Sequence, residues 1–329
     1  MQTIHFKNKP RIVATGTIAG PKECAGVIGK YVDKALSDDT FGESTYEKAE
    51  CKMLKYAVSQ TIANAGETEK NIDMLISGDL LNQIISASFA ARDFDFPFLG
   101  VYGACSTLAE SLAIGAAFIN AGYVKKIVAA TGSHFSSAER QYRYPLELGC
   151  TRPPQAQWTV TGAGGALLAN EGGNIAITSA TLGKVVDFGI TDVNNMGAAM
   201  APAAADTILN HLRDTGRSAD YYDLIVTGDL GALGSRIVKD LIWEKGVDIQ
   251  DNHVDCGEIV YNVIEDEFQG GSGAGCSAVV FGSYLFDGLK KKKINRILLA
   301  ATGALLSTVS SGQGESIPCI CHAVAIENV

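Results

Sequence analysis

The sequence predicts an α/β protein made of two similar halves, and two internal repeats carry this prediction. Residues 65–80, AGETEKNIDMLISGDL, return as residues 215–230, TGRSADYYDLIVTGDL. Residues 127–132, IVAATG, similarly resemble residues 298–303, LLAATG. A chain that repeats segments in the same order is typical of a duplicated domain. We therefore expect halves at 1–186 and 187–329, with a ligand site where they meet.

Composition supports a well-buried α/β protein and argues against several other classes. Hydrophobic residues make up 47% of the chain and charged residues 19%, which does not fit a disordered or fibrous protein. The net charge of −9 argues against a nucleic-acid partner. The basic run 290–293 is interpreted as the solvated end of a helix, with a lipid or protein patch as the alternative.

Neither end of the chain nor its interior shows a membrane signal. The first residues lack the apolar core of a signal peptide, and no stretch reaches the roughly 18 apolar residues that cross a bilayer. We expect a soluble chain whose membrane association, if it has one, is peripheral.

The eight cysteines show neither the spacing of a disulfide framework nor that of a zinc site. They are interpreted as reduced thiols, and no metal or other cofactor is expected. Their positions are 24, 51, 105, 150, 256, 276, 319 and 321.

In the first half, short apolar stretches alternate with helical patterns. A helix over 46–64 is predicted from the spacing of Met53, Ala57 and Ile62, and Gly66 closes it. The other predicted elements are strand 74–77, helix 80–92, strand 98–102, helix 106–121, strand 127–131 and a closing hairpin of 157–170 with 175–182.

The second half repeats this order. Pro202 suits the first position of a helix, and the segment 187–200 before it is either a linker or a loop over the site. Short buried strands between helices predict parallel pairing with helices on both faces. The predicted elements are helix 203–213, strand 224–227, helices 231–244 and 277–292, and strands 297–302 and 317–326.

Cys105 is the main candidate for chemistry, because it lies between a buried strand and the start of a helix. A thiol at a helix N-terminus meets the helix dipole and unpaired N–H groups, which lower its pKa. Gly103 beside it lets backbone or ligand approach closely. The alternative is a small buried cysteine with a packing role.

Seven motifs extend over nearly the whole chain. They are GDLLNQ (78–83), YGACSTLAES (102–111), SHFSSAERQYRYP (133–145), WTVTGAGGALL (158–168), NMGAAMAPAAADT (195–207), GGSGAGCSA (270–278) and ATGALLS (301–307). With the repeat and the cysteine at a strand-to-helix turn, they resemble the thiolase superfamily. Within it, the chain is most similar to the stage V sporulation protein AD family of spore-forming bacteria. The resemblance implies a thiolase-like duplicated fold of two βαβαβ halves, layered α-β-α-β-α.

This resemblance also implies a function. Members bind dipicolinic acid (pyridine-2,6-dicarboxylate), as the free acid or its calcium complex, and act with other membrane proteins of the SpoVA operon. They serve its uptake into the developing spore and its release at germination. The implied location is peripheral, on the cytoplasmic side of the forespore or spore inner membrane, and the superfamily implies a homodimer.

Catalysis in the superfamily needs a Cys with a His and a second His or Asn from the other half. Carried over through the repeat, those positions fall at Gly228 or Asp229 and near Ser272, so the required residue types are missing. We therefore expect a binding protein and no enzyme. The alternatives are an acyl-transfer enzyme of thiolase or ketoacyl-synthase type, using Cys105 with His134 or Asp79, and a scaffold with a collapsed pocket.

A flat dicarboxylate needs N–H donors, cations and apolar walls. The helix starts at Cys105 and Ser272 are expected to offer N–H groups to one place. Arg140 and Arg143 are candidates for fork-shaped carboxylate contacts, with surface arginines as the alternative.

Three further polar residues each have two interpretations. Asp79 contacts the ligand or caps the following helix, as its repeat counterpart Asp229 suggests. Asn82 has Ala232 at the equivalent position, which favours a ligand contact. His134 is either a ligand contact or a loop histidine bonded to backbone.

Overall fold

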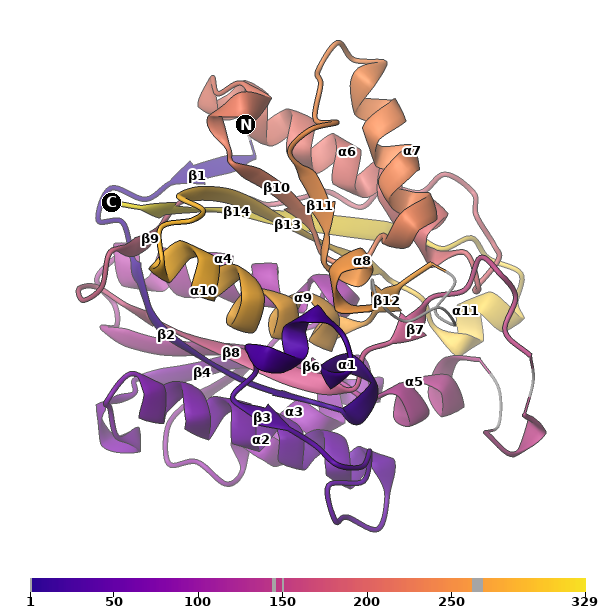
Figure 1. The fold of residues 1–329 in the computed structure, drawn as a ribbon, viewed down its shortest axis with the longest axis horizontal. Helices are drawn as coiled ribbons and strands as arrows, with labels where there is room; N and C mark the ends of the chain where they lie inside the picture. Colours follow the sequence, from indigo (N-terminus) through magenta and orange to yellow (C-terminus); the bar gives the residue numbers. More distant parts are fainter. Residues whose placement is uncertain (1, 144–145, 150, 262–268) are drawn as a thin grey trace.

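A computed structural model describes residues 2–143, 146–149, 151–261 and 269–329 (Figure 1). Cys150 and the last two residues of the 133–145 motif lie outside the described residues. The main sheet consists of two groups of strands, β2-β8-β6-β4-β5 and β9-β14-β13-β10-β11. The groups meet through one pair of residues, Arg11 and Ala176.

The two groups of strands have matching order, which is the structural form of the sequence repeat. The first group contains β2 (Arg11–Ala19), β8 (Gly162–Ala169), β6 (Lys126–Ser133), β4 (Met74–Gly78) and β5 (Phe98–Gly100). The second contains β9 (Ile175–Thr181), β14 (Cys319–Asn328), β13 (Arg296–Ala304), β10 (Leu224–Thr227) and β11 (His253–Asp255). The first repeat includes β4 and β10, and the second includes β6 and β13, so equivalent sequences occupy equivalent strands.

Short strands complete the pairing. β1 (Thr3–His5) pairs with β9, β3 (Lys34–Ala35) pairs with β2, and β7 (Trp158–Thr159) pairs with β12 (Gly271–Ser272). β1 and β2 follow each other in the chain, yet they join different groups of strands.

Strand direction differs between the outer and inner parts of each group. β4 runs parallel to β5 and β6, and β10 runs parallel to β11 and β13. β8 and β14 are antiparallel to their neighbours, so the expectation of parallel pairing is wrong for the inner strands. The expected hairpin is also wrong, because β8 pairs with β2 and β6 while β9 pairs with β14. By pairing, β9 belongs with the second group of strands, although it precedes residue 187.

Helices form three layers around the two groups of strands, which gives the α-β-α-β-α order (Figure 1). One outer layer contains α2 (Tyr46–Asn64) and α3 (Ile85–Ala91), and the other contains α6 (Met196–Thr215) and α7 (Gly231–Trp243). The middle layer contains α4 (Thr107–Asn120) and α9 (Ala274–Val280), which continues through a π-turn into α10 (Phe286–Lys290). Smaller helices are α1 (Pro21–Cys24), α5 (Phe135–Tyr142), α8 (Cys256–Tyr261) and α11 (Thr308–Gly312).

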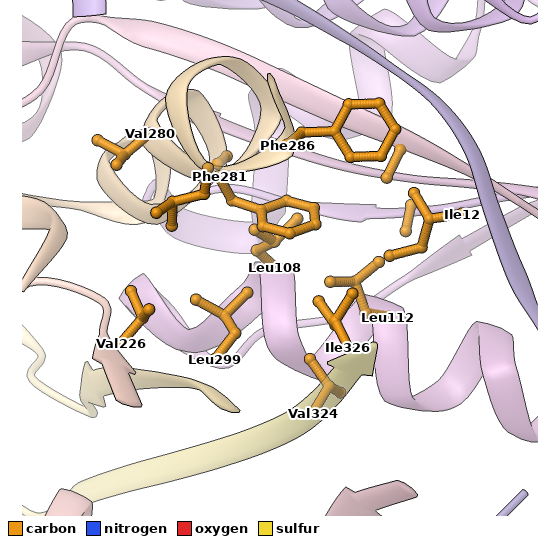
Figure 2. Packing of buried hydrophobic residues seen from close by; sticks show 14 of the residues in the cluster. Ile12, Leu108, Leu112, Val226, Val280, Phe281, Phe286, Leu299, Val324 and Ile326 are labelled. Carbon is orange, nitrogen blue, oxygen red and sulfur yellow. The ribbon is translucent and has the colours of Figure 1, made fainter. Parts of the chain in front are cut away.

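The middle layer is the centre of the hydrophobic core. Figure 2 shows Leu108 and Leu112 of α4 beside Phe281, with side chains of both groups of strands around them. Burial of each such side chain stabilises the fold by roughly 1.5–3 kcal/mol. Because α4 and α9 are enclosed between the two groups of strands, packing on both sides fixes the place of their N-terminal ends.

Three helix starts differ from the prediction. The helix predicted over 277–292 begins at Ala274 as α9, directly after Gly273, whose φ of 99° lies outside the helical region. α3 begins at Ile85, because Gln83 and Ile84 have φ values of 57° and 47°, in the left-handed region. α6 begins at Met196, so Pro202 lies inside the helix. The cause is close packing of α6 on α7: a Cβ at Gly197 would lie 2.2 Å from the Leu230 carbonyl oxygen. The segment 187–200 is therefore loop only as far as residue 195.

No helix in the described part of the chain is long and apolar enough to cross a membrane.

Candidate functional site

A cavity lies where the starts of α4 and α9 meet the carboxyl ends of the neighbouring strands. Its volume is about 60 Å³, which is enough for a few water molecules. Among the described residues that line it, Arg143 is the one charged side chain and there is no carboxylate. The lining residues are Leu80, Tyr102, Ala104, Cys105, Ala138, Tyr142, Arg143, Thr159, Met196, Met200, Ser272, Ala304 and Leu306.

The Cys105 side chain lies beside the carboxylate of Asp229, which follows β10. The buried Asp229 carboxylate accepts hydrogen bonds from Thr302 Oγ1 at 2.8 Å, Ser272 Oγ at 3.2 Å and the Gly273 N–H at 3.0 Å. Burial raises the pKa of Cys105 well above its ordinary value, and the negative charge of Asp229 raises it further. The expected lowering of this pKa is therefore wrong, and the thiol is protonated at neutral pH.

Several backbone N–H groups at the starts of the middle helices donate hydrogen bonds to other groups of the protein. The Gly273 N–H donates to Asp229, and the Gly275 N–H donates to Ser133 Oγ at 3.0 Å. The Ser106 N–H donates to the Gly103 carbonyl oxygen at 3.0 Å. At these positions the expectation of donors free for a ligand is wrong, because side chains and turns of the chain itself already satisfy them.

The two candidate arginines of α5 lie in different environments. The Arg143 side chain is 7% exposed and lines the cavity, whereas that of Arg140 is 44% exposed and forms an ion pair with Glu47 outside it. Arg143 donates to Glu139, one helical turn earlier. Burial lowers the pKa of Arg143, and the ion pair with Glu139 opposes this effect.

Arg152 joins this group, although the sequence analysis did not single it out. Its Nη1 lies 2.9 Å from Glu139 Oε1, so two guanidinium groups share one carboxylate. Arg143 Nε and Arg152 Nη2 are buried and have no hydrogen-bond partner within the described ranges. The eight residues between the two arginines show no periodic pattern, so nothing in the sequence indicated their proximity.

The remaining candidates lie outside the cavity wall. Asp79 accepts hydrogen bonds from the N–H groups of Leu81 and Ala87, both at 2.7 Å. These bonds agree with the interpretation that Asp79 caps the following helix. Asn82 lines a groove outside the cavity, where its N–H donates to the Gln141 side chain at 3.0 Å.

His134 is bonded to backbone at both ring nitrogens. Its Nδ1 accepts from the Ser136 N–H at 3.1 Å and caps α5, and its Nε2 lies 2.8 Å from the Asp39 carbonyl oxygen. Since Nδ1 is an acceptor, Nε2 carries the proton and donates. Burial lowers the pKa of His134, which keeps the ring neutral.

Two tyrosines separate the cavity from the outer groove. The hydroxyl oxygens of Tyr102 and Tyr142 lie 3.3 Å apart, and Tyr142 also donates to the Leu80 carbonyl oxygen. Both tyrosines line the cavity and the groove, whose volume is about 430 Å³. Ala138 and Tyr142 stand four residues apart on α5, as do Met196 and Met200 on α6, so each pair lies on one face of its helix; the sequence analysis did not single out these wall residues.

Comparison with known proteins identifies the family. A profile of the stage V sporulation protein AD family matches residues 1–327. The chain belongs to this family. It is 46% identical over 326 residues to stage V sporulation protein AD of Bacillus subtilis (strain 168), which covers 99% of this chain and 96% of that protein. The family expected from the motifs is thus confirmed, and with it a role in sporulation.

Solved structures with the same fold are enzymes of the thiolase-like class. This chain is similar to 3-oxoacyl-[acyl-carrier-protein] synthase III of Aquifex aeolicus, with a TM-score of 0.59 and 14% identity over 97% of this chain and 99% of that one. It is also similar to a variant of OleA from Xanthomonas campestris, with a TM-score of 0.61 and 13% identity over 98% and 99%. At such low identity the likeness shows the fold alone, and the predicted thiolase-like fold is confirmed.

Proposed function

We propose that this chain binds dipicolinate in the Cys105 cavity without changing it chemically, and that this binding serves uptake into the developing spore and release at germination. Membership of the sporulation family supports the biological role. One observation carries the ligand chemistry: the apolar cavity has a single charged lining residue, Arg143, whose buried Nε lacks a partner among the described residues.

The cavity wall matches the chemistry of a flat aromatic dicarboxylate. Leu80, Met200 and Leu306 offer apolar surface to a ring. Arg143 offers a guanidinium to a carboxylate, and the hydroxyls of Thr159 and Ser272 are further donors. The calcium ion of a calcium complex would have to bring most of its oxygen ligands with it, because the described lining residues include no carboxylate.

The environment of Cys105 argues against acyl transfer. That reaction needs a thiolate and donors for a developing oxyanion. Here the thiol lies beside the Asp229 carboxylate, whose negative charge raises the pKa of the thiol and which accepts the N–H of Gly273. The two alternative partners of the thiol, His134 and Asp79, are committed to backbone groups outside the cavity.

Calorimetry with dipicolinate tests the proposal directly. The wild-type chain should bind dipicolinate, and Cys105→Trp, which fills the cavity, should abolish binding while the circular dichroism spectrum is retained. Cys51→Trp is the matched control, because Cys51 is equally half-buried but lies on α2, away from the cavity. Absence of binding by the wild type at millimolar ligand would reject the proposal.

A second measurement addresses the acyl-transfer alternative. Incubation with acyl-coenzyme A should leave the mass of the protein unchanged. An acyl adduct on Cys105, or turnover of the thioester, would favour an enzyme instead.

We extend the proposal to the setting in which binding acts. The chain works as a peripheral protein on the cytoplasmic side of the spore inner membrane, beside other membrane proteins of the SpoVA operon, and as a homodimer. Fractionation of spores, with the protein released from the membrane pellet by high salt, tests the location. Cross-linking in spores tests the partners, and light scattering tests the dimer.

A further inference from the structure

Arg143, Glu139 and Arg152 form a charge cluster at the α5 end of the cavity. Glu139 Oε1 accepts from Arg143 and lies 2.9 Å from Arg152 Nη1. The side chains of Arg143, Glu139 and Arg152 are 7%, 8% and 16% exposed. The cluster therefore has two positive charges and one negative charge, almost out of reach of water.

This excess of buried positive charge costs free energy unless an anion offsets it. A buried cation without a full set of acceptors loses its hydration without replacement. Within this cluster, Arg143 Nε and Arg152 Nη2 are buried donors that have no hydrogen-bond partner among the described residues. An anion that reaches Arg143 from the cavity would supply both the missing charge and a missing acceptor.

Arg152 is held in place by aromatic rings. Its guanidinium lies 5.2 Å from the ring centre of Trp158 and 5.6 Å from that of Phe135, and these two rings stack 3.8 Å apart. Such cation–π contacts fix the guanidinium while it pairs with Glu139. Arg152 is not a lining residue of the cavity, so it acts on a ligand only through Glu139.

We propose that Arg143 binds one carboxylate of the ligand and that Arg152 is a positioning residue. The ion pair of Arg152 with Glu139 weakens the attraction between Glu139 and Arg143, so that Arg143 can bind that carboxylate. The inference rests on the proposed function and deepens it, because it names the recognised group and its place. The ligand class is a planar aromatic carboxylic acid whose acid group points toward α5. Its ring lies against the apolar wall formed with Leu80 and Leu306.

Calorimetry on the full-length chain with dipicolinate tests this assignment. Arg143→Gln should weaken binding by about 10- to 100-fold, the range for a lost hydrogen bond to a charged group. Arg140→Gln is the matched control, since Arg140 lies on the same helix but pairs with Glu47 outside the cavity; its affinity should stay within about twofold of wild type. The neutral analogue pyridine-2,6-dicarboxamide should not bind the wild type.

The positioning role of Arg152 has its own test. Arg152→Gln should weaken binding by roughly 3- to 10-fold although it removes no ligand contact, and Arg152→Lys, which keeps the ion pair with Glu139, should restore most of the affinity. Glu139→Gln should strengthen binding, because it removes the internal competitor for Arg143. A purely structural role of the cluster would make all three variants bind more weakly.

The two levels of the proposal fail in different ways. If the wild type does not bind dipicolinate, the proposed function is rejected. If the wild type binds and Arg143→Gln binds equally well, the function stands and the assignment to Arg143 is overturned. If Arg143→Gln does not fold, the response to Glu139→Gln decides, since weaker or unchanged binding contradicts the assignment.

Discussion

The thiol of Cys105 and the carboxylate of Asp229 lie beside each other at the place where the two halves of the fold meet. By the repeat, Asp229 corresponds to Asp79, yet the two carboxylates have different partners. Asp79 accepts hydrogen bonds from backbone N–H groups of its own half. In the second half Asp255 performs that task, accepting from the N–H groups of residues 230 and 231 at 2.9 Å. Asp229 is thereby available to face Cys105.

Removal of the Asp229 charge should make Cys105 more reactive. In Asp229→Asn the burial of the thiol remains, but the negative charge that raises its pKa is gone, so the pKa falls. Since alkylation proceeds through the thiolate, the rate with iodoacetamide at pH 8 should rise by about tenfold or more. Peptide mass spectrometry measures this rate for Cys105.

Cys24 and Cys51 are internal controls for this experiment. Both are half-buried and distant from Asp229, so their alkylation rates should not change. A uniform rise at all three positions would indicate loosening of the fold, and an unchanged rate at Cys105 would show that Asp229 does not control the thiol.

Tyr102 and Tyr142 are expected to control access to the cavity. Tyr102 is 42% exposed, and its hydroxyl meets that of Tyr142 between the cavity and the outer groove. Tyr102→Ala should accelerate alkylation of Cys105 by a bulky maleimide more than alkylation by iodoacetamide, because it widens the passage without altering the thiol. Tyr123→Ala, at a tyrosine that is 77% exposed elsewhere, is the control. Equal acceleration of both reagents would contradict a role in access.

Glu23 should make the stability of the protein depend on pH. Glu23 of α1 is buried and accepts from the Thr161 N–H at 2.9 Å and from the Tyr261 hydroxyl. Burial raises the pKa of Glu23 from 4.5 to about 7. Because the folded state binds this proton more tightly, the contribution to stability is complete below about pH 4.5. It is lost as the pH rises through 7.

Glu23→Gln keeps a neutral side chain at every pH, so its comparison with wild type separates the titration of Glu23 from that of all other groups. The free energy of unfolding of the variant, relative to wild type, should increase by about 2–3 kcal/mol between pH 5 and pH 8. Urea denaturation at several pH values measures it. Glu67→Gln is the control: the hydrogen bond from Lys126 lowers the pKa of Glu67, so this variant should show no gain at pH 8. If the difference in unfolding free energy between Glu23→Gln and wild type did not change with pH, the prediction would be refuted.

Elements with local signals were predicted well. The helix Tyr46–Asn64 has the predicted bounds, because its apolar spacing lies within the segment and the Thr45 cap and Gly66 flank it closely. The repeat also predicted that β4 and β10 occupy equivalent positions, because similar sequences form similar strands.

Features that depend on distant parts of the chain were not predictable. The insertion of β2 between β8 and β9 depends on residues more than 140 positions apart. The left-handed conformation of Ile84 runs against the preference of a β-branched residue, and tertiary packing imposes it. Of the cavity wall, Cys105, Arg143 and Ser272 were among the candidates, whereas the Arg152 contact arises only when β7 and α5 come together.

The placement of β1 has a consequence for how the protein is made. Thr3 pairs with Thr181, and the Gln2 N–H donates to Asp214 at 2.7 Å, so during synthesis β1 has to wait for partners that are made much later. Contacts between such distant residues form slowly, and unpaired strands in partly made chains are prone to aggregation. Folding during translation can therefore assemble much of the first group of strands early. The amino-terminal strand, however, closes the structure only after more than half of the chain has emerged.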